Sequence, residues 1–444
     1  MVAAAVQTQQ HGIYEIQGDG VLNLNLHSGQ QRAYWSDKRF VLILAGTQSG
    51  KTSIGPAWLF REMQERGPGD YLVASPTFPL MEIKVLPEFR RFFKGMFGLG
   101  DYVSSPLRKF TINQQGNEIL FGNPNPGEES HVYFGYGVDP ESLESATYKA
   151  AWLDEPGQKK FKLASWEAIL RRLSIAQGRV LLTTTPYTLG WLKTEVHDRA
   201  DDPLADIEVI NFPSIANPMF SRDEWERAKR TLPAWKFEMF YQGRFTRPAG
   251  MIFDNFDTTR HVMPRFAIPE HWERFLGLDF GGVNTAGTFW AKELNADGKP
   301  TGRFVGYREY HAGGRTAKEH AAALLAGEPR IPTAVGGSKS EGQWRHEFAE
   351  GGLPINPPVV HDVEVGINRV YAGLQQTAPD ESIDLVIFDD LPGLKDQFLT
   401  YSRELDEKGD PTEKIEDKDT YHFLDATRYI VSYLQSGLSD QLFY

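Results

Sequence analysis

The chain has 444 residues, of which 41% are hydrophobic and 24% are charged, so we expect a folded protein with more than one domain. It contains no cysteine, which excludes disulfides, thiolate zinc sites and a cysteine nucleophile. The net charge of -12 argues against passive coating of nucleic acid, but not against an enzyme that holds DNA on a local basic patch. All of the excess negative charge falls in residues 266–444, because residues 1–265 carry equal numbers of basic and acidic side chains.

In the first part of the chain, strand-like runs alternate with helical patterns, which is typical of an α/β domain with a mostly parallel sheet. The strand-like runs are RFVLILA, DYLVAS, EILFG, HVYFGYG, KAAWLD and RVLLTTT. The helical runs are WLFREMQERG and SWEAILRRLSIAQG. No apolar run approaches the length of a membrane span, and the N-terminus lacks the basic residue of a signal peptide, so we expect no membrane partner.

The run from Phe40 to Leu44 is followed by a loop that is typical of phosphate binding, because a glycine-containing turn between a strand and a helix directs backbone N–H groups at phosphates. The predicted contacts of this loop with nucleotide come from Ala45, Gly46, Thr47, Gln48, Ser49, Gly50, Lys51 and Thr52. We expect Lys51 to reach the β- and γ-phosphates of ATP and Thr52 to ligate Mg²⁺. A chance loop is the alternative. Pro56 follows so closely that we expect a kink in the helix.

The run KAAWLD ends in two consecutive acids, Asp154 and Glu155. We predict that Asp154 holds the Mg²⁺ shell and that Glu155 polarises the attacking water as general base. Pro156 favours an extended backbone at Glu155, which would keep the acid off the next helix. The alternative is a strand end with two solvated acids.

Three further segments hold weaker candidates for nucleotide contact. Thr184, in the run Thr183 to Thr185, ends a strand that can lie beside the other two and sense the γ-phosphate. Arg171 and Arg172 can stabilise transition-state charge within one subunit or in a neighbour, and Gln30 can read adenine. Strand threonines, solvated arginines and a surface glutamine are the alternative interpretations.

Gly and Pro gather in residues 246–267, where periodicity fades, and we interpret this stretch as a linker. A new unit follows with three strand-like runs, RFLGLDFGG, TAGTFWAKEL and RFVGYREYH, and Asp297-Gly298 predicts a hairpin between the last two. Helices and strands then alternate up to a final helix, YHFLDATRYIVSYLQSG, which indicates a mixed α/β domain. The predicted division is therefore an N-terminal extension (1–21), a first domain (22–245), the linker (246–267) and a second domain (268–444).

Acids stand at the ends of separate elements of this second domain: Asp279 ends a strand, Glu341 begins a helix and Asp425 lies in the last helix. Such acids can converge on two Mg²⁺ or Mn²⁺ ions, which clamp the attacking and leaving oxygens in phosphodiester hydrolysis. Gly281 and Gly282 would let a phosphate backbone approach, and His422 can assist protonation or bind phosphate. Surface acids and helix caps are the alternative.

The segments LAGTQSGKT, AAWLDEPG, LLTTTPY, LGLDFGG and HFLDATRY, in this order, resemble the large terminase subunit of tailed double-stranded DNA phages. The resemblance spans about residue 22 to the end. It implies a P-loop ATPase domain of the ASCE type followed by a nuclease domain of ribonuclease H-like fold. Lys51, Thr52, Asp154 and Glu155 match the nucleotide motifs, Thr183 to Thr185 match the coupling motif, and Asp279 and Asp425 match the first and last nuclease acids. Glu341 is the least secure match, and Thr47 stands where many relatives have an arginine.

The resemblance further implies an activity and its partners. It implies an ATP-driven motor that moves double-stranded DNA into a procapsid, together with a Mg²⁺- or Mn²⁺-dependent nuclease that cuts the concatemer. The implied partners are double-stranded DNA, the portal of the procapsid, the small terminase subunit and further copies of the chain in a ring on the portal. The implied location is the cytoplasm of the infected bacterium, with transient docking on the portal.

Three alternative functions stay open on the sequence alone. One is an ATP-driven helicase or translocase with an inert second domain, and another is a nuclease that an ATPase domain regulates. The third is a non-enzymatic, ATP-gated DNA-binding module, against which the intact Asp154-Glu155 pair argues. Residues 159–162 and 227–230 are candidate contacts to DNA phosphates, although solvated charge runs are more common.

Overall fold

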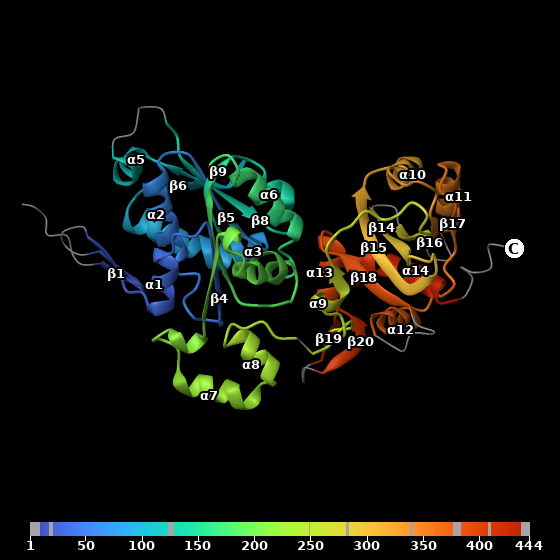
Figure 1. The fold of residues 1–444 in the computed structure, drawn as a ribbon. Coiled ribbons are helices and arrows are strands. Elements are labelled where there is room, and N and C mark those ends of the chain that lie inside the picture. The colour runs from blue at the N-terminus through green and yellow to red at the C-terminus, as the bar shows by residue number, and fades with distance from the viewer. Residues whose placement is uncertain are drawn as a thin grey trace, which may run out of the picture. The chain divides into compact units, whose positions relative to one another are not determined.

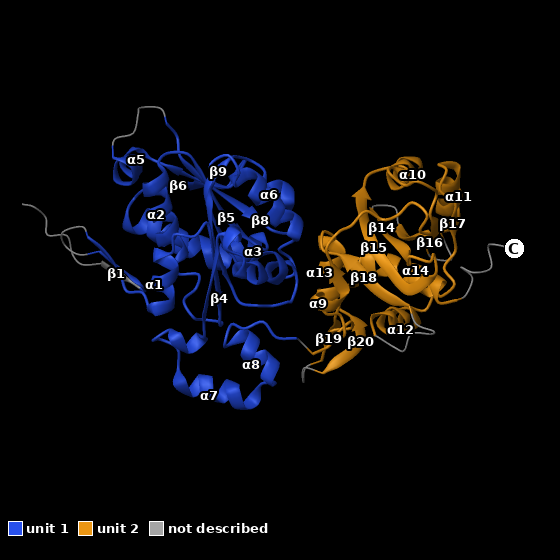
Figure 2. Ribbon diagram, viewed as in Figure 1, with its two compact units in different colours: residues 1–248 blue, residues 249–444 orange. Residues whose placement is uncertain are grey.

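The computed structural model describes residues 9–16, 21–122, 128–247, 249–280, 284–337, 341–375, 383–406 and 410–436. The chain forms two compact units, residues 1–248 and 249–444 (Figure 2). Unit 1 is an α/β unit and unit 2 is a mixed α/β unit, as the sequence predicted (Figure 1).

Unit 1 is built on an eight-stranded sheet whose order is β11-β4-β10-β9-β5-β8-β7-β6. The first six strands of this order run parallel, and β7 and β6 are added in antiparallel pairing. The strands are β4 (Phe40–Ala45), β5 (Asp70–Ser75), β6 (Gly100–Val103), β7 (Lys109–Ile112), β8 (His131–Tyr136), β9 (Tyr148–Asp154), β10 (Arg179–Thr184) and β11 (Ile207–Phe212). Because β4, β9 and β10 are adjacent and parallel, their carboxyl ends, which carry the predicted nucleotide residues, lie together.

Helices cover both faces of this sheet. Alternate residues of β4 point to opposite faces, so Val41 packs in one core cluster with Trp58 and Leu42 packs in another with Trp166. The helices of unit 1 are α1 (Ser28–Trp35), α2 (Gly55–Arg66), α3 (Phe78–Leu80), α4 (Leu86–Arg90), α5 (Gln114–Phe121), α6 (Leu163–Leu173), α7 (Arg222–Thr231) and α8 (Ala234–Phe240), with π-helical segments η1 (Met81–Val85), η2 (Arg91–Met96) and η4 (Leu192–His197). A small separate sheet holds β1 (Gln9–His11), β2 (Tyr14–Ile16) and β3 (Leu22–Leu24).

Two local predictions for unit 1 are wrong. The run EILFG is the end of helix α5 and not a strand, because the Asn113 side chain caps the N-terminus of α5 and Gly122 ends the helix in a left-handed conformation. Pro56 does not kink a helix, because α2 begins only at Gly55 and the proline occupies its first turn, where no N–H is needed.

Unit 2 is built on a seven-stranded sheet whose order is β12-β18-β15-β14-β13-β16-β17. The predicted meander is present: β13, β14 and β15 pair antiparallel, and Gly298 takes a positive φ of 77° in the predicted turn. The strands of this sheet are β12 (Val262–Met263), β13 (Arg274–Phe280), β14 (Asn284–Leu294), β15 (Pro300–Gly313), β16 (Thr333–Gly336), β17 (Ile355–Asn356) and β18 (Asp384–Phe388). The other elements are α9 (Thr258–His261), α10 (Ala317–Leu325), α11 (Gly342–Glu350), α12 (Val363–Leu374), α13 (Pro392–Thr400), α14 (His422–Leu434) and the hairpin of β19 (Arg403–Leu405) and β20 (Pro411–Ile415).

The last helix, α14, lies directly on β13. A Cβ atom at Gly277 would stand 2.1 Å from the carbonyl oxygen of Ala426, so only glycine permits this approach. The contact brings the part of α14 that carries Asp425 onto the strand that carries Asp279.

The stretch predicted as a linker is structured from Met251 onward. The Ile252 backbone N–H donates to the carbonyl of Tyr401, Phe253 and Phe256 are buried, and α9 and β12 follow. The two units meet in sequence at residues 248 and 249, near the start of that stretch.

Candidate functional site

The predicted phosphate loop runs from the end of β4 to the start of α2. Gln48 and Gly50 take positive φ angles of 53° and 85°, which turn the backbone sharply before Lys51. Gly46 is held tightly, because a Cβ atom there would lie 2.2 Å from the carbonyl oxygen of Tyr241. This strand, turn and helix are the arrangement that binds nucleotide phosphates.

Neighbouring segments hold the loop from two sides. The Gln30 side chain donates to the Gly50 carbonyl at 2.8 Å and accepts from the His27 backbone at 3.2 Å, so both ends of its amide hold the local structure. On the other side, the Thr47 N–H donates to the Phe240 carbonyl at 2.7 Å. The Asn217 side chain donates to the Gln48 carbonyl at 2.8 Å. The loop is thus tied to the segment that carries α7 and α8.

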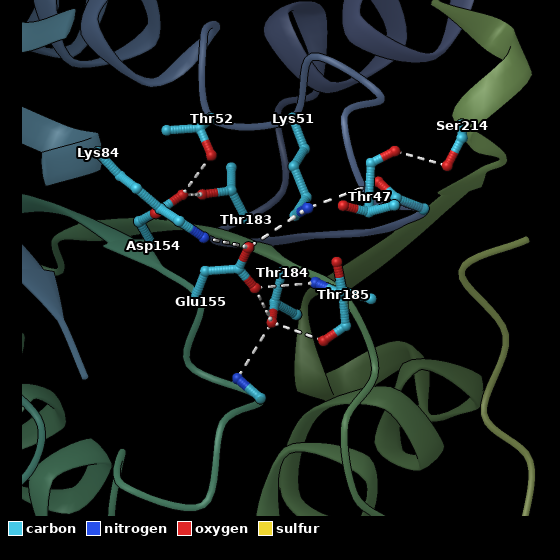
Figure 3. A network of polar contacts seen from close by, with 12 residues as sticks. Thr47, Lys51, Thr52, Lys84, Asp154, Glu155, Thr183, Thr184, Thr185 and Ser214 are labelled. Atoms are coloured by element: carbon cyan, nitrogen blue, oxygen red, sulfur yellow. Dashed lines mark hydrogen bonds and ion pairs between the residues drawn. The ribbon is translucent and has the colours of Figure 1, made fainter. Parts of the chain in front are cut away.

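Asp154 ends β9 and is fully buried at the carboxyl edge of the sheet. Its Oδ1 accepts hydrogen bonds from Thr52 Oγ1 at 2.8 Å and from Thr183 Oγ1 at 2.9 Å (Figure 3). Its Oδ2 is buried and has no hydrogen-bond partner among the described residues. Burial and then the charge of Glu155 raise the pKa of Asp154. A divalent cation bound at Oδ2 and at the Thr52 hydroxyl would relieve both effects, so these residues fit Mg²⁺.

Glu155 is held differently from the sequence prediction. Its φ is +56°, so the backbone is left-handed and not extended, and its N–H donates to the Thr183 carbonyl at 2.7 Å. Its Oε2 accepts from the Thr185 N–H at 3.2 Å and from Thr184 Oγ1 at 3.3 Å. The constraint of pairing with β10 outweighs the preference that Pro156 imposes.

The other carboxylate oxygen of Glu155 faces two cations. Lys51 Nζ lies 3.3 Å and Lys84 Nζ lies 4.0 Å from Glu155 Oε1 (Figure 3). The charge of Glu155 also acts on Tyr187. Burial, followed by this charge, raises the pKa of the Tyr187 hydroxyl. Sequence reasoning did not single out Lys84 or Tyr187. Tyr187 stands two residues after the threonine run in the sequence, whereas Lys84 belongs to no motif.

The predicted arginines lie elsewhere. Arg171 and Arg172 both pair with Glu144, at 2.6 and 3.3 Å, at the end of α6. The backbone after α6 packs against Lys149 near the start of β9, whereas the acids stand at its opposite end. A contact from Arg172 to nucleotide in a neighbouring subunit stays a prediction.

In unit 2 the structure places two of the three predicted acids near one another. Asp279 Oδ2 lies 2.7 Å from His422 Nδ1, and this bond raises the pKa of His422. Asp425 Oδ1 accepts from Arg428 Nε at 3.1 Å and also from Arg428 Nη2. Burial, opposed by Arg428, raises the pKa of Asp425, and the charge of Asp279 adds to this effect.

Glu341 does not complete a metal site in the described part of the chain. Burial, followed by the charges of Asp279, Asp425 and Glu341 among others, raises the pKa of Tyr429 to about 12. Yet no group of three His, Cys, Asp or Glu side chains within the described residues has a geometry that could hold a metal ion. The three-acid metal site therefore stays a prediction. Gly281 and Gly282 lie outside the described residues.

The remaining predictions concern the two basic runs that could contact DNA and the absence of a membrane span. Arg227 pairs with Glu224 at 2.6 Å, and Phe161, within the run of lysines, is buried. The helices in the described parts of the chain are all too short or too polar to span a membrane.

Comparisons with known proteins were made on sequence and on structure. Residues 42–260 match the family model described as terminase large subunit, T4likevirus-type, N-terminal. The fold is similar to that of the large terminase of a thermophilic bacteriophage, at 18% identity over 92% of this chain and 98% of that chain, with a TM-score of 0.43. It is also similar to the HK97 bacteriophage large terminase, at 12% identity over 93% and 95% of the two chains, with a TM-score of 0.45. The nuclease domain of the bacteriophage SPP1 large terminase with bound Mn matches 41% of this chain and 98% of that chain, at 18% identity and a TM-score of 0.31. The comparison with curated proteins gave no match.

Proposed function

This chain belongs to the large terminase family of tailed bacteriophages, and from that premise we propose that it is a DNA-packaging motor subunit. In this proposal unit 1 hydrolyses ATP to translocate double-stranded DNA into the procapsid, and unit 2 cuts concatemeric DNA. The observation that carries the proposal is the bond from Thr52 Oγ1 to Asp154 Oδ1, at 2.8 Å, beside the buried and unpartnered Oδ2.

Each residue of the nucleotide site has a defined part in hydrolysis. Thr52 and Asp154 would hold Mg²⁺, which would supply positive charge to neutralise the phosphates of ATP. Lys51 leaves Glu155 to bind the phosphates, and this frees Oε1 of Glu155 to accept a proton from the attacking water. Thr184 and the Thr185 N–H keep Oε2 in place, so the base is oriented before substrate arrives.

Two connections can transmit loss of the γ-phosphate to the rest of unit 1. One is the threonine strand β10, which contacts both acids. The other is the backbone of the phosphate loop, which bonds to Phe240 of α8 and to Asn217 before α7. We infer that a shift of these segments moves a DNA-gripping surface.

Unit 2 supports the nuclease proposal through Asp279 and Asp425. We propose that these acids, with Glu341, bind Mg²⁺ or Mn²⁺, and that His422 carries a proton or binds phosphate. Because no assembled group of three such side chains is present among the described residues, we assign no catalytic step to a metal there. We further propose that the chain acts in the host cytoplasm as a ring on the portal, with the small terminase subunit as a partner.

The motor proposal is tested by DNA translocation. We expect the wild-type chain with ATP to displace a third strand from a DNA triplex, and Glu155→Ala to leave the triplex intact while still binding ATP. Equal displacement by both proteins would contradict the proposal.

The same absence of a three-acid metal site among the described residues favours a second candidate function, an ATP-driven translocase whose second unit is inert. That candidate predicts the same triplex displacement but no cleavage of supercoiled plasmid with either Mg²⁺ or Mn²⁺.

A further inference from the structure

A second lysine reaches the catalytic end of unit 1 from outside the phosphate loop. Lys84 lies in η1, which follows β5, and β5 is the direct neighbour of β9 in the sheet. Its Nζ points at Glu155 Oε1 from a different element than Lys51 (Figure 3). Short π-helical segments such as η1 are frequent at functional sites.

The two lysines compete for one carboxylate oxygen. Glu155 Oε2 already accepts from Thr184 and Thr185, so Oε1 is the atom that faces both ammonium groups. Two like charges on one acceptor repel each other, so a single carboxylate oxygen cannot satisfy both ammonium groups fully. An anion placed between the two lysines would bind both of them and would release Oε1.

The two lysines also differ in exposure. The side chain of Lys51 is 6% exposed and fixed beside the loop, whereas that of Lys84 is 45% exposed. Lys84 can therefore follow a charge that moves during the reaction. Phosphoryl transfer spreads negative charge over the oxygens of the γ-phosphate, and a cation outside the phosphate loop commonly neutralises it.

The other positions that the sequence suggested for this task do not supply the positive charge. Thr47 is neutral where many relatives have an arginine, and Arg171 and Arg172 pair with Glu144. We propose that Lys84 is a further catalytic residue, which binds the γ-phosphate of ATP in the transition state from within the same chain. This inference rests on the proposed ATP hydrolysis and names a residue that completes it.

The test compares ATP hydrolysis by the full-length wild type, Lys84→Met and Lys84→Arg. The matched control is Lys94→Met, because Lys94 is an exposed lysine of the neighbouring segment η2 and pairs with Asp101. We expect Lys84→Met to lower kcat about 100-fold or more, with KM for ATP changed less than about threefold, since the charge acts mainly in the transition state. Lys84→Arg should recover most of kcat, and Lys94→Met should match the wild type.

A binding measurement separates this role from a structural one. Lys84→Met should bind ADP with Mg²⁺ as the wild type does, but should lose most of the added affinity that aluminium fluoride, a mimic of the transferring phosphoryl group, gives to ADP. An unchanged kcat in Lys84→Met would overturn the inference. A raised kcat would also overturn it, because Lys84 would then restrain Glu155 and not bind substrate. A wild type that hydrolyses no ATP, with or without DNA, would overturn this inference and the proposed function together.

Discussion

The two acidic sites of this molecule are held by different chemistry. In unit 1, Asp154 at the end of β9 accepts from the hydroxyls of Thr52 and Thr183, whereas the lysines Lys51 and Lys84 pair with the next residue, Glu155. In unit 2, Asp279 and Asp425 come from different elements, and each is bound by a basic side chain of α14. Neutral donors leave the charge of a carboxylate available to a metal, whereas a cationic partner already balances it.

The difference shows what each site needs before it can work. In the proposed nucleotide site, Asp154 Oδ2 is buried and has no hydrogen-bond partner among the described residues, so a cation could bind this oxygen without displacing a basic side chain from it. If the acids of unit 2 bind metal as proposed, Asp279 and Asp425 would first have to exchange their bonds to His422 and Arg428 for it. We therefore expect substitutions in unit 1 to change the chemistry directly, and substitutions around Asp425 to change stability as well.

The largest expected effect is in unit 1. Asp154→Asn keeps the acceptor for Thr52 and Thr183 but removes the charge that binds Mg²⁺. We expect kcat for ATP to fall more than about 100-fold, because even supporting residues of metal ligands contribute ~10–100-fold. Steady-state hydrolysis checks this prediction, with Asp101→Asn, an exposed acid paired with Lys94, as the matched control. A loss of less than tenfold would mean that Asp154 is not a metal ligand.

A smaller effect, on stability, is expected in unit 2. Arg428 is buried, and Arg428→Met would leave the largely buried Asp425 without its partner. We expect the free energy of unfolding of unit 2 to fall by about 3 kcal/mol, the cost of breaking a buried pair from one side.

Urea unfolding followed by hydrogen exchange in residues 249–444 measures that change. The double variant Asp425→Asn/Arg428→Met should recover most of the loss, because no buried charge then remains unpaired. If the single and double variants are equally unstable, then Arg428 contributes packing and not charge.

The smallest expected effect is the pH response at the phosphate loop. His27 Nε2 lies 3.1 Å from the Ser49 carbonyl oxygen, its Nδ1 is buried without a partner in the described structure, and burial lowers the pKa of His27 from 6.5. Below pH 6.5 the unfolded chain therefore binds more protons than the native one, so stability is full above this pH and falls as the pH drops.

We expect unit 1 to lose roughly 0.5 kcal/mol between pH 7.5 and pH 5.5 from this partly exposed group. Thermal unfolding of wild type beside His27→Gln, which cannot titrate, checks the difference between the two slopes. A wild type that is stabilised by acid relative to His27→Gln would contradict the assignment.

The nucleotide site was largely predictable from sequence because it is local. Lys51 and Thr52 follow β4, Asp154 ends β9 with Glu155 directly after it, and a parallel sheet brings such strand ends to one edge. What the sequence could not supply depends on neighbours distant in the chain. The left-handed backbone of Glu155 follows from pairing with β10, and the helix in place of the strand EILFG follows from two capping residues.

The acidic site of unit 2 was less predictable because its residues come from distant parts of the chain. The proximity of Asp425 to Asp279 follows from the contact of α14 with β13 at Gly277. No sequence motif predicts this contact. The spacing of Asp425 and Arg428, one helical turn apart, allows the two side chains to pair, but the spacing does not show that the pair is buried. Lys84 could not be predicted for the same reason, because its ion pair with Glu155 forms only when the sheet is folded.

The central claim is that one chain carries two separate hydrolytic sites. The most direct test measures ATP hydrolysis and Mn²⁺-dependent cleavage of supercoiled plasmid on the same preparations of wild type, Glu155→Gln and Asp279→Asn. The account predicts that Glu155→Gln loses ATP hydrolysis and keeps cleavage, and that Asp279→Asn shows the reverse. Cleavage by Asp279→Asn at the wild-type rate, or no cleavage by the wild type with either Mn²⁺ or Mg²⁺, would contradict the account.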